Sequence, residues 1–370
     1  MTNYTNDNRI ILTLDAGGTH FLFSAIQAGK EIVKPIHKAT DSSNLSNCIV
    51  QLKEGFREVM SQLHCPPSAI SFAFPGPADY LQGIIGDLPN FPCFQGGVPL
   101  GPILEGEFDL PVFINNDGGL FAYGEALTGT LPEINHRLTD KGSSKKFYNL
   151  IGVTLGTGFG CGIVLNKQLL VGDNATAGNI WCMRNKKYQN LIAEESVSIR
   201  SIKRVYTELS GDNSELSPKD IFEIAEGTKQ GDQKAARHSF HELGEMAGDA
   251  LAAAVALIDG IIVVGGGLAG AAKYILPGIV GELNSSLGML QGKQLSRLPM
   301  KVYNLDDEDV WEEFAKGQEI TLTMPDSNRK ITYDPIKRIG IMTSRQNTSY
   351  SIAMGAYTFA LLKLDERSSQ

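Results

Sequence analysis

Two glycine-rich segments carry the residue types that bind phosphate. DAGGT (15–19) ends an apolar run that begins at residue 9, and LGTG (155–158) ends a similar run 140 positions later. Glycine tolerates positive φ and lets backbone N–H groups approach a phosphate closely. Each turn adds a threonine hydroxyl, and Asp15 adds a carboxylate that can hold Mg²⁺ directly or through water. One such turn is typical of a tight hairpin, whereas the pair predicts a nucleotide site.

A third glycine run supports a competing interpretation. IIVVGGGLAG (261–270) contains a literal G-x-G-x-x-G, formed by Gly265, Gly267 and Gly270 after an apolar strand. A dinucleotide site also needs an acidic residue about 20 positions later, at the end of a second strand. Glu282 is in range, but its surroundings show no strand pattern. A dehydrogenase would also leave the two earlier turns unexplained, so this interpretation is the weaker one.

Other nucleotide-binding signatures are missing. The sequence contains no G-x-x-x-x-G-K-[ST], and His136-Arg137-Leu138 lacks the aspartate of a protein-kinase catalytic loop. The formal charge of −8 provides no basic face for nucleic acid. The five cysteines form no Cys-x-x-Cys pair, which argues against a disulfide framework and a four-cysteine zinc site. No secretory leader or membrane span is visible, so we expect a cytoplasmic protein.

An internal repeat indicates the architecture. Each half contains the unit strand, glycine turn, strand, turn, strand, followed by a segment with helical spacing at 45–63 or 235–258 and then another strand. With 370 residues, of which 42% are hydrophobic, the chain is long enough for about two domains. Strands that alternate with helices favour sheets covered by helices. We therefore predict two related α/β domains.

Taken in order, these segments resemble the ROK family of bacterial sugar kinases and repressors. DAGGT and LGTGFGCGIV (155–164) are similar to the two phosphate motifs, IIVVGGGLAG to the adenosine segment, and MGAYTFALL (354–362) to the second connecting helix. Only 14 residues precede Asp15, too few for the helix-turn-helix of the repressors, so we expect a kinase.

The resemblance implies two actin-like (ribonuclease H-like) domains with a cleft between them. Residues 1–117 plus about 352–370 would form the first domain. Residues 118–351 would form the second, with a β-rich insertion near 296–350. Family members are often homodimers, which we also expect here.

The resemblance also implies a site. Asp117, in VFINNDGGLFAYGE (112–125), takes the place of the general base that accepts the proton of an attacking alcohol. Its alternative role is to cap the helix that begins near Gly118. Asn90 and Asn116 match positions that hydrogen-bond sugar hydroxyls, although an Asx turn is an alternative for each. The residues expected to contact ATP, with Mg²⁺ held by Asp15, are Asp15, Gly17, Gly18, Thr19, Gly156, Thr157, Gly158, Gly265, Gly266 and Gly267.

The sequence departs from the family in its second sugar motif. Ala177-Gly178-Asn179-Ile180-Trp181-Cys182 stands where Ala-Gly-Glu-Ile-Gly-His is usual, and the cysteine-rich zinc motif that normally follows is missing. Zinc is therefore not predicted. Glu194, or Glu195 beside it, matches a glutamate that contacts sugar hydroxyls, with a solvated helix face as the alternative. Because an amide at Asn179 donates as well as accepts, the substrate could be another hexose, an N-acetyl sugar or a polyol.

Three hypotheses follow. The favoured one is an ATP- and Mg²⁺-dependent kinase that phosphorylates a sugar hydroxyl with Asp117 as general base. The second is a catalytically altered sugar sensor of the same fold, suggested by Asn179 and Cys182. The third is a nucleotide-dependent oxidoreductase based on Gly265, Gly267 and Gly270. All three predict a small-molecule ligand, without nucleic acid or membrane as a partner.

Overall fold

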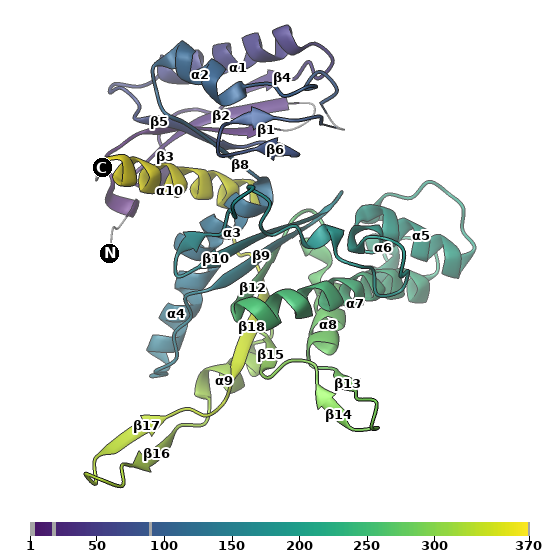
Figure 1. The fold of residues 1–370 in the computed structure, drawn as a ribbon. Helices are drawn as coiled ribbons and strands as arrows, with labels where there is room; N and C mark the ends of the chain where they lie inside the picture. Colours follow the sequence, from purple (N-terminus) through teal and green to yellow (C-terminus); the bar gives the residue numbers. More distant parts are fainter. Residues whose placement is uncertain (1–3, 17–19, 89–90, 369–370) are drawn as a thin grey trace. The chain divides into compact units, whose positions relative to one another are not determined.

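The computed structural model describes residues 4–16, 20–88 and 91–368. It divides by contacts into two units (Figure 1). Unit 1 comprises Met1–Gly129, Gly162–Gly178 and Gln346–Gln370, and unit 2 comprises Thr130–Cys161 and Asn179–Arg345. Each unit has its own sheet, as the internal repeat predicts.

The sheet of unit 1 has the order β3-β2-β1-β5-β8, and β4 pairs with the first half of β2. Its strands are β1 (Ile11–Ala16), β2 (His20–Gln27), β3 (Lys30–Glu31), β4 (Ile36–Ala39), β5 (Ala69–Ala73) and β8 (Val112–Asn115). β1 runs antiparallel to β2 and parallel to β5, and β5 runs parallel to β8. All five residues of β5 are buried, as expected for a central strand with both faces covered.

Helices cover both faces of this sheet. Alternate side chains of β1 point to opposite faces. Leu12 joins a core formed with Leu52 and Phe56 of α1, whereas Ile11 joins a second core formed with Met354 and Tyr357 of α10. Figure 1 shows α1 and α2 on one side of the sheet and α10 on the other. The helices of unit 1 are α1 (Leu45–Met60), α2 (Leu100–Phe108), α3 (Asp117–Leu127) and α10 (Thr348–Ser368).

Glycines allow α3 and α10 to pack with their backbones in contact. A Cβ on Gly355 would lie 1.9 Å from the carbonyl oxygen of Leu120, and one on Gly124 would lie 2.0 Å from that of Ser351. The hydroxyl of Ser351 donates a 2.6 Å hydrogen bond to the buried carboxylate of Glu125. Because of this contact, α3 belongs to unit 1, whose first segment ends at Gly129. The predicted domain boundary, at 117/118, lies instead at the start of α3 and separates it from β8.

The sheet of unit 2 has the order β11-β10-β9-β12-β18-β15. β12 is its central strand and runs parallel to β9 and β18. β10 crosses the division between the units, because its residues after Cys161 group with unit 1. The strands are β9 (Leu150–Leu155), β10 (Phe159–Leu165), β11 (Gln168–Leu169), β12 (Ile261–Gly265), β15 (Lys301–Asn304) and β18 (Arg338–Thr343).

The helices of unit 2 pack mainly around α7, which contacts α5, α6 and α8. The α7–α8 contact is as close as that of α3 and α10, since a Cβ on Gly244 would lie 2.2 Å from the carbonyl oxygen of Ile275. The helices are α4 (Thr130–Asp140), α5 (Ile199–Ser210), α6 (Pro218–Glu226), α7 (Gln233–Ile258), α8 (Ala272–Leu283) and α9 (Glu308–Lys316).

Short two-stranded ribbons complete the fold. β6 (Ala78–Asp79) pairs with β7 (Ile84–Ile85) in unit 1. In unit 2, β13 (Ser286–Gly288) pairs with β14 (Gln294–Ser296), and β16 (Ile320–Thr323) pairs with β17 (Lys330–Tyr333). The region 296–350, predicted as a β-rich insertion, therefore has mixed structure. β15 and β18 belong to the central sheet, α9 is helical, and β16–β17 stands apart.

The close contact of α3 with α10 predicts a large effect of one methyl group. Gly355→Ala should destabilise the protein by about 1–3 kcal/mol, because the new Cβ meets backbone that cannot move aside. Gly106→Ala in α2 is the matched control, since nothing lies within 4 Å of its Cβ position, and should leave stability unchanged or raise it by up to about 1 kcal/mol. Thermal unfolding of both variants tests the contact, and equal midpoints would contradict it.

Candidate active site

In unit 1, the predicted catalytic segments meet at one edge of the sheet. β1, β5 and β8 are parallel, and their register aligns Asp15 with Ala73 and Ala73 with Asn115. The carboxyl ends of parallel strands lie at the same edge, where ligands of α/β proteins commonly bind. The strand order thus places Asp15 and the loop after β5 at the edge where β8 delivers Asn116 and Asp117.

The start of α3 fixes the conformation of Asn116 and Asp117. The Oδ1 atom of Asn116 caps the helix, because it accepts hydrogen bonds from the N–H groups of Gly118 at 2.9 Å and Gly119 at 3.3 Å. Asp117 is the first helical residue, and its Oδ1 accepts from the same Gly118 N–H at 2.8 Å. The cap is therefore Asn116, and the helix N-terminus holds one oxygen of Asp117.

The surroundings of Asp117 make its carboxylate a stronger base. Desolvation raises the pKa of Asp117 above its ordinary value, and the negative charge of Asp15 raises it further. The hydrogen bond from Gly118 lowers this pKa, but desolvation is the larger effect. The residue is nevertheless open to solvent. The surrounding protein therefore desolvates the carboxylate, but a substrate can still reach it. A general base needs both properties.

Tyr80 also belongs to this edge, although no motif in the sequence marks it. Its hydroxyl donates to the carbonyl oxygen of Phe74 at 3.0 Å and is hydrogen-bonded by Asn116. Burial raises the pKa of Tyr80 to about 12, so the phenol stays protonated. Gly76 makes room for it, since a Cβ there would lie 2.8 Å from the Tyr80 oxygen. With one face of Asn116 capping α3 and the other bound to Tyr80, the amide holds the start of α3 against the loop after β5.

In unit 2, the turn between β9 and β10 has an open backbone. The N–H of Gly156 donates to the carbonyl oxygen of Gly158 at 3.1 Å, and the carbonyl oxygen of Gly156 accepts from Ile199 at 2.9 Å. Thr157, at the tip, is exposed. Nothing lies within 4 Å of the Cβ position of Gly156. This arrangement leaves room for a phosphate beside the threonine hydroxyl and the glycine backbone.

The carboxylate of Glu194 lies against this turn. Its Oε2 accepts a 2.9 Å hydrogen bond from the N–H of Phe159, and its Oε1 lies 3.5 Å from Arg200. A Cβ on Gly158 would lie 2.7 Å from Oε2, so the glycine is needed for this approach. The resemblance assigns Glu194 to the sugar, whereas the geometry shows that its carboxylate also holds the turn between β9 and β10. Glu195, the alternative by one residue, pairs with Arg200 at 3.1 Å.

The third glycine run lies beside the same turn. Gly265 pairs with Thr154 across β12 and β9, and Leu268 donates to the carbonyl oxygen of Leu155 at 3.0 Å. Gly266 has a φ of +89°, and a Cβ there would lie 2.4 Å from the Leu155 oxygen. Gly267 faces open space. Residues 156–158 and 265–267, which are more than 100 positions apart in the sequence, therefore form one backbone surface.

The altered sugar motif has a defined orientation at Asn179. Its Oδ1 accepts a 3.0 Å hydrogen bond from the indole N–H of Trp181. Since an indole N–H only donates, the oxygen of the amide must face the tryptophan. Asn179 is exposed, and 39% of Trp181 is exposed. The amide N–H groups of Asn179 therefore point away from the indole and can donate to a ligand.

Some predicted site residues lie outside the described residues, and the dinucleotide interpretation loses its acidic residue. Gly17, Gly18, Thr19 and Asn90 lie outside the described residues. Glu282, which the dinucleotide interpretation requires at the end of a strand, lies inside α8, pairs with Lys186 at 2.5 Å and is hydrogen-bonded by Arg297. The G-x-G-x-x-G of residues 265–270 therefore lacks its acidic partner.

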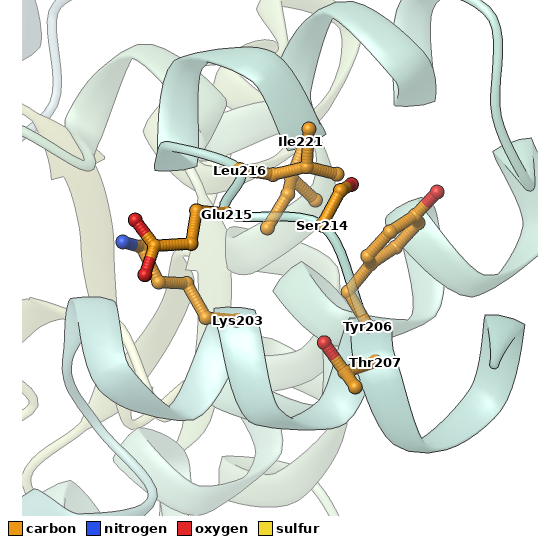
Figure 2. Close-up of a pocket in the computed structure, with 7 residues that line it drawn as sticks. All are labelled: Lys203, Tyr206, Thr207, Ser214, Glu215, Leu216 and Ile221. Carbon is orange, nitrogen blue, oxygen red and sulfur yellow. The ribbon is translucent and has the colours of Figure 1, made fainter. Parts of the chain in front are cut away.

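A surface pocket is lined by other residues. It has a volume of about 320 Å³ and lies at α5, α6 and the connection between them. Figure 2 shows Lys203 and Glu215 at one end of this pocket and Tyr206 at the other. Its lining includes none of the predicted site residues, so the catalytic assignment rests on the sheet edge and the glycine turns.

Asp15 has the chemistry of a magnesium ligand. Mg²⁺ is commonly held by one or two carboxylates together with substrate phosphates and water, so a dedicated protein cage is not needed. Within residues 4–16, 20–88 and 91–368, no three histidine, cysteine or acidic side chains gather into a metal cluster. A carboxylate at the end of β1, in electrostatic contact with Asp117, fits a magnesium ion that reaches the site with its nucleotide.

Comparison with known proteins decides the family. The ROK family profile matches residues 11–301. The chain belongs to the ROK family. A glucokinase crystal structure from Parabacteroides distasonis is similar over 98% of this chain and 99% of that chain, with 59% identity and a TM-score of 0.89.

More distant relatives agree. A glucokinase of Thermotoga maritima is 26% identical over 308 residues, covering 73% of this chain and 90% of its own length. A Streptomyces griseus ROK glucokinase solved with glucose and AMPPNP shares the fold at 18% identity and a TM-score of 0.58, with 94% of this chain and 98% of that chain covered. The two actin-like domains predicted from the sequence are those of ROK sugar kinases. No described helix is long and apolar enough to cross a bilayer.

The position of Glu194 against the turn between β9 and β10 predicts that loss of its carboxylate weakens the binding of ATP. Glu194→Ala should raise the KM for ATP about 10-fold, because the turn loses a hydrogen bond to a charged group. Glu195→Ala is the control, since that neighbour pairs with Arg200 at a similar distance without contacting the turn. Steady-state kinetics with each substrate varied in turn measure the effect. A rise confined to the KM for sugar would show that Glu194 acts on the sugar alone.

Proposed function

We propose that the protein transfers the γ-phosphoryl group of ATP to a hydroxyl of glucose or a closely related hexose, with Asp117 as the general base. The chain is an ATP-dependent sugar kinase of the ROK family, like the relatives named glucokinase and N-acetyl-D-glucosamine kinase. The assignment of Asp117 rests on the position of its carboxylate at the start of α3. There it accepts a hydrogen bond from Gly118, and its pKa is raised.

The chemistry of the chain follows from this position. A sugar hydroxyl becomes acidic as it attacks the γ-phosphorus, and Asp117 accepts the proton late in that step. Asp15 would hold Mg²⁺, which neutralises charge on the phosphates when bound. Asn116 and Tyr80 keep the carboxylate in place through the cap of α3 and the bond to Phe74. Asp117 is thus positioned by backbone and neutral groups that do not compete for its proton.

The glycine surface of unit 2 supports nucleotide binding. Gly156, Thr157 and Gly158 would surround the phosphates, with the N–H groups of Thr157 and Gly158 and the threonine hydroxyl as donors. Gly265–Gly267 would let adenosine approach the backbone beside them. The same role falls to Gly17, Gly18 and Thr19 in the first turn. The proposed reaction requires both sets of residues to reach one ATP molecule.

Asn179 and Trp181 bear on the choice of sugar. Because the amide oxygen of Asn179 accepts from Trp181, the N–H groups of Asn179 are oriented to donate to a sugar. A donor at this position suits a hydroxyl or carbonyl oxygen that accepts, where the usual glutamate would accept from two hydroxyls. Asn90, Asn116 and Glu194 are proposed as the other sugar contacts. Glucose is favoured by the 59% identity to a glucokinase.

Two further properties belong to the proposal. The described cysteines are all free, which suits a reducing compartment, and ATP is made in the cytoplasm; we place the enzyme there. We also propose that two copies form a homodimer.

Removal of the proposed base gives the direct functional test. Asp117→Asn should lower kcat by about 10²–10⁴-fold, the usual contribution of a general base, while ATP binding is retained. The amide oxygen can still accept from Gly118, so the start of α3 is preserved. Product formation with glucose and ATP, together with calorimetric titration of ATP, measures both quantities. Wild-type turnover in this variant would exclude Asp117 as the base.

The raised pKa of Asp117 also has a consequence for stability. The unfolded carboxyl titrates near 3.8 and the folded one at higher pH, so folding is disfavoured progressively as the pH rises from 3.8 through the folded pKa. Asp117→Asn should therefore have a higher Tm than the wild type at neutral pH. The difference should vanish below 3.8, where both side chains are neutral. A Tm difference that is independent of pH would contradict this origin.

A further inference from the structure

Two ribbons of unit 2 lie outside its packed body. β13 pairs only with β14, and β16 only with β17, within the described residues. All residues of these four strands are exposed. In Figure 1, both ribbons project from unit 2, beyond the sheet strands β15 and β18. We call β13–β14 the short ribbon and β16–β17 the arm.

The arm has one apolar and one polar face. Ile320 lies opposite Tyr333, and Leu322 lies opposite Ile331. Side chains two positions apart on a strand share a face, so these four form one apolar surface. They are 40–48% exposed. The other face carries Thr321, Thr323, Lys330 and Thr332.

The base of the arm is fixed to unit 2. Arg338, whose side chain is only 1% exposed, pairs with Asp334 at 2.5 Å and donates to the carbonyl oxygen of Phe314 at 2.7 Å. Asp334 also accepts from the N–H of Gln318 at 3.3 Å, which lies at the base of the other strand of the arm. Glu319 accepts a 2.8 Å hydrogen bond from Ser144. Asp334, which is paired with the buried Arg338 and hydrogen-bonded by Gln318, thus ties the two strands of the arm together at its base.

The short ribbon carries a matching surface. Leu287 and Leu295 lie directly opposite each other and therefore share a face. Met289 and Leu290 extend this apolar surface at the tip of the ribbon, and Leu290 is fully exposed. The opposite face carries the directly paired Ser286 and Ser296. The short ribbon, like the arm, is amphipathic with its apolar side uncovered.

We infer that the arm of one copy packs on the short ribbon of a second copy, and that the reciprocal contact completes a twofold dimer. A two-stranded ribbon is marginal in water unless its apolar face is covered. Both complementary surfaces are present in every chain, so a second copy supplies the cover in fixed proportion. A twofold axis makes each arm meet one short ribbon, which closes the assembly. The inference rests on the proposed homodimer and is independent of the kinase chemistry.

The area involved suits a stable dimer. The eight apolar side chains of the two surfaces expose on the order of 800 Å² per copy, which is the share of each partner in a standard interface. Large exposed apolar patches with a polar surround commonly mark protein–protein interaction sites. The polar Thr321 and Ser286 faces stay in water. The predicted interface therefore buries only the apolar sides.

Charge placed on either apolar face tests the contact. Leu322→Asp with Ile331→Asp, and separately Leu287→Asp with Leu295→Asp, should raise the dimer dissociation constant by about 100-fold or more, because carboxylates are forced against apolar surface. The controls Thr321→Asp with Thr332→Asp, and Ser286→Asp with Ser296→Asp, carry the same cross-strand charge pair on the opposite faces. They should remain dimeric. Light scattering after size exclusion, over a dilution series, gives the masses.

Mixing the two apolar-face variants distinguishes the reciprocal contact from other dimers. Each variant alone should be monomeric, whereas the mixture should form a heterodimer in which one arm–ribbon contact is intact. A mixture that stays monomeric would overturn the contact, as would a monomeric wild type or a dimeric arm variant. Thermal unfolding and kinase activity of each variant identify misfolding. A monomeric wild type with full kinase activity would reject the dimer and leave the proposed function standing.

Discussion

The proposed reaction depends on keeping a carboxylate ionised in crowded surroundings. Desolvation and the charge of Asp15 favour the protonated form of Asp117, whereas the Gly118 N–H at the start of α3 favours the ionised form. The balance leaves a carboxylate with a raised pKa that is still accessible. A fully solvated aspartate would be a weaker base, and one buried without the helix N-terminus would lose its charge. The fold must therefore place a helix start at the edge of the sheet.

The position of α3 at the sheet edge depends on direct contacts between backbones. The parallel register of β1, β5 and β8 sets the sheet edge, and the glycine contact of α3 with α10 holds the helix that follows β8. In unit 2, the turn at Gly266 touches the Leu155 backbone for the same reason. Both parts of the site thus rely on positions where even one methyl group does not fit. Such positions set geometry more tightly than side-chain packing, because backbone atoms cannot change rotamer.

Much of this could be predicted from the sequence, because it depends on local pattern. Apolar runs that end in glycine turns identified β1, β9 and β12, and helical spacing identified α1 and α7. Order and spacing then indicated the ROK family, which the profile match confirms. The roles assigned to Asp15, Asp117 and the glycines remain predictions, now with a geometry that suits them.

The features that were missed depend on contacts distant in sequence. Nothing local marks Tyr80 as the partner of Asn116, because the bond forms only when the loop after β5 folds back on β8. Glu194 reaches the phosphate turn 35 positions away, and the grouping of α3 with α10 joins opposite ends of the chain. The sequence indicated the arm only as part of a β-rich insertion, because exposure, and not sequence pattern, shows that its apolar side is uncovered.

The most direct measurement is a crystal structure with glucose and a non-hydrolysable ATP analogue. The account predicts that one sugar hydroxyl lies about 2.6–3.2 Å from the carboxylate of Asp117 and faces the γ-phosphorus, with the Thr157 turn at the phosphates. A complex in which the hydroxyl nearest the γ-phosphorus is bound by another residue, while Asp117 contacts only its own helix, would contradict it.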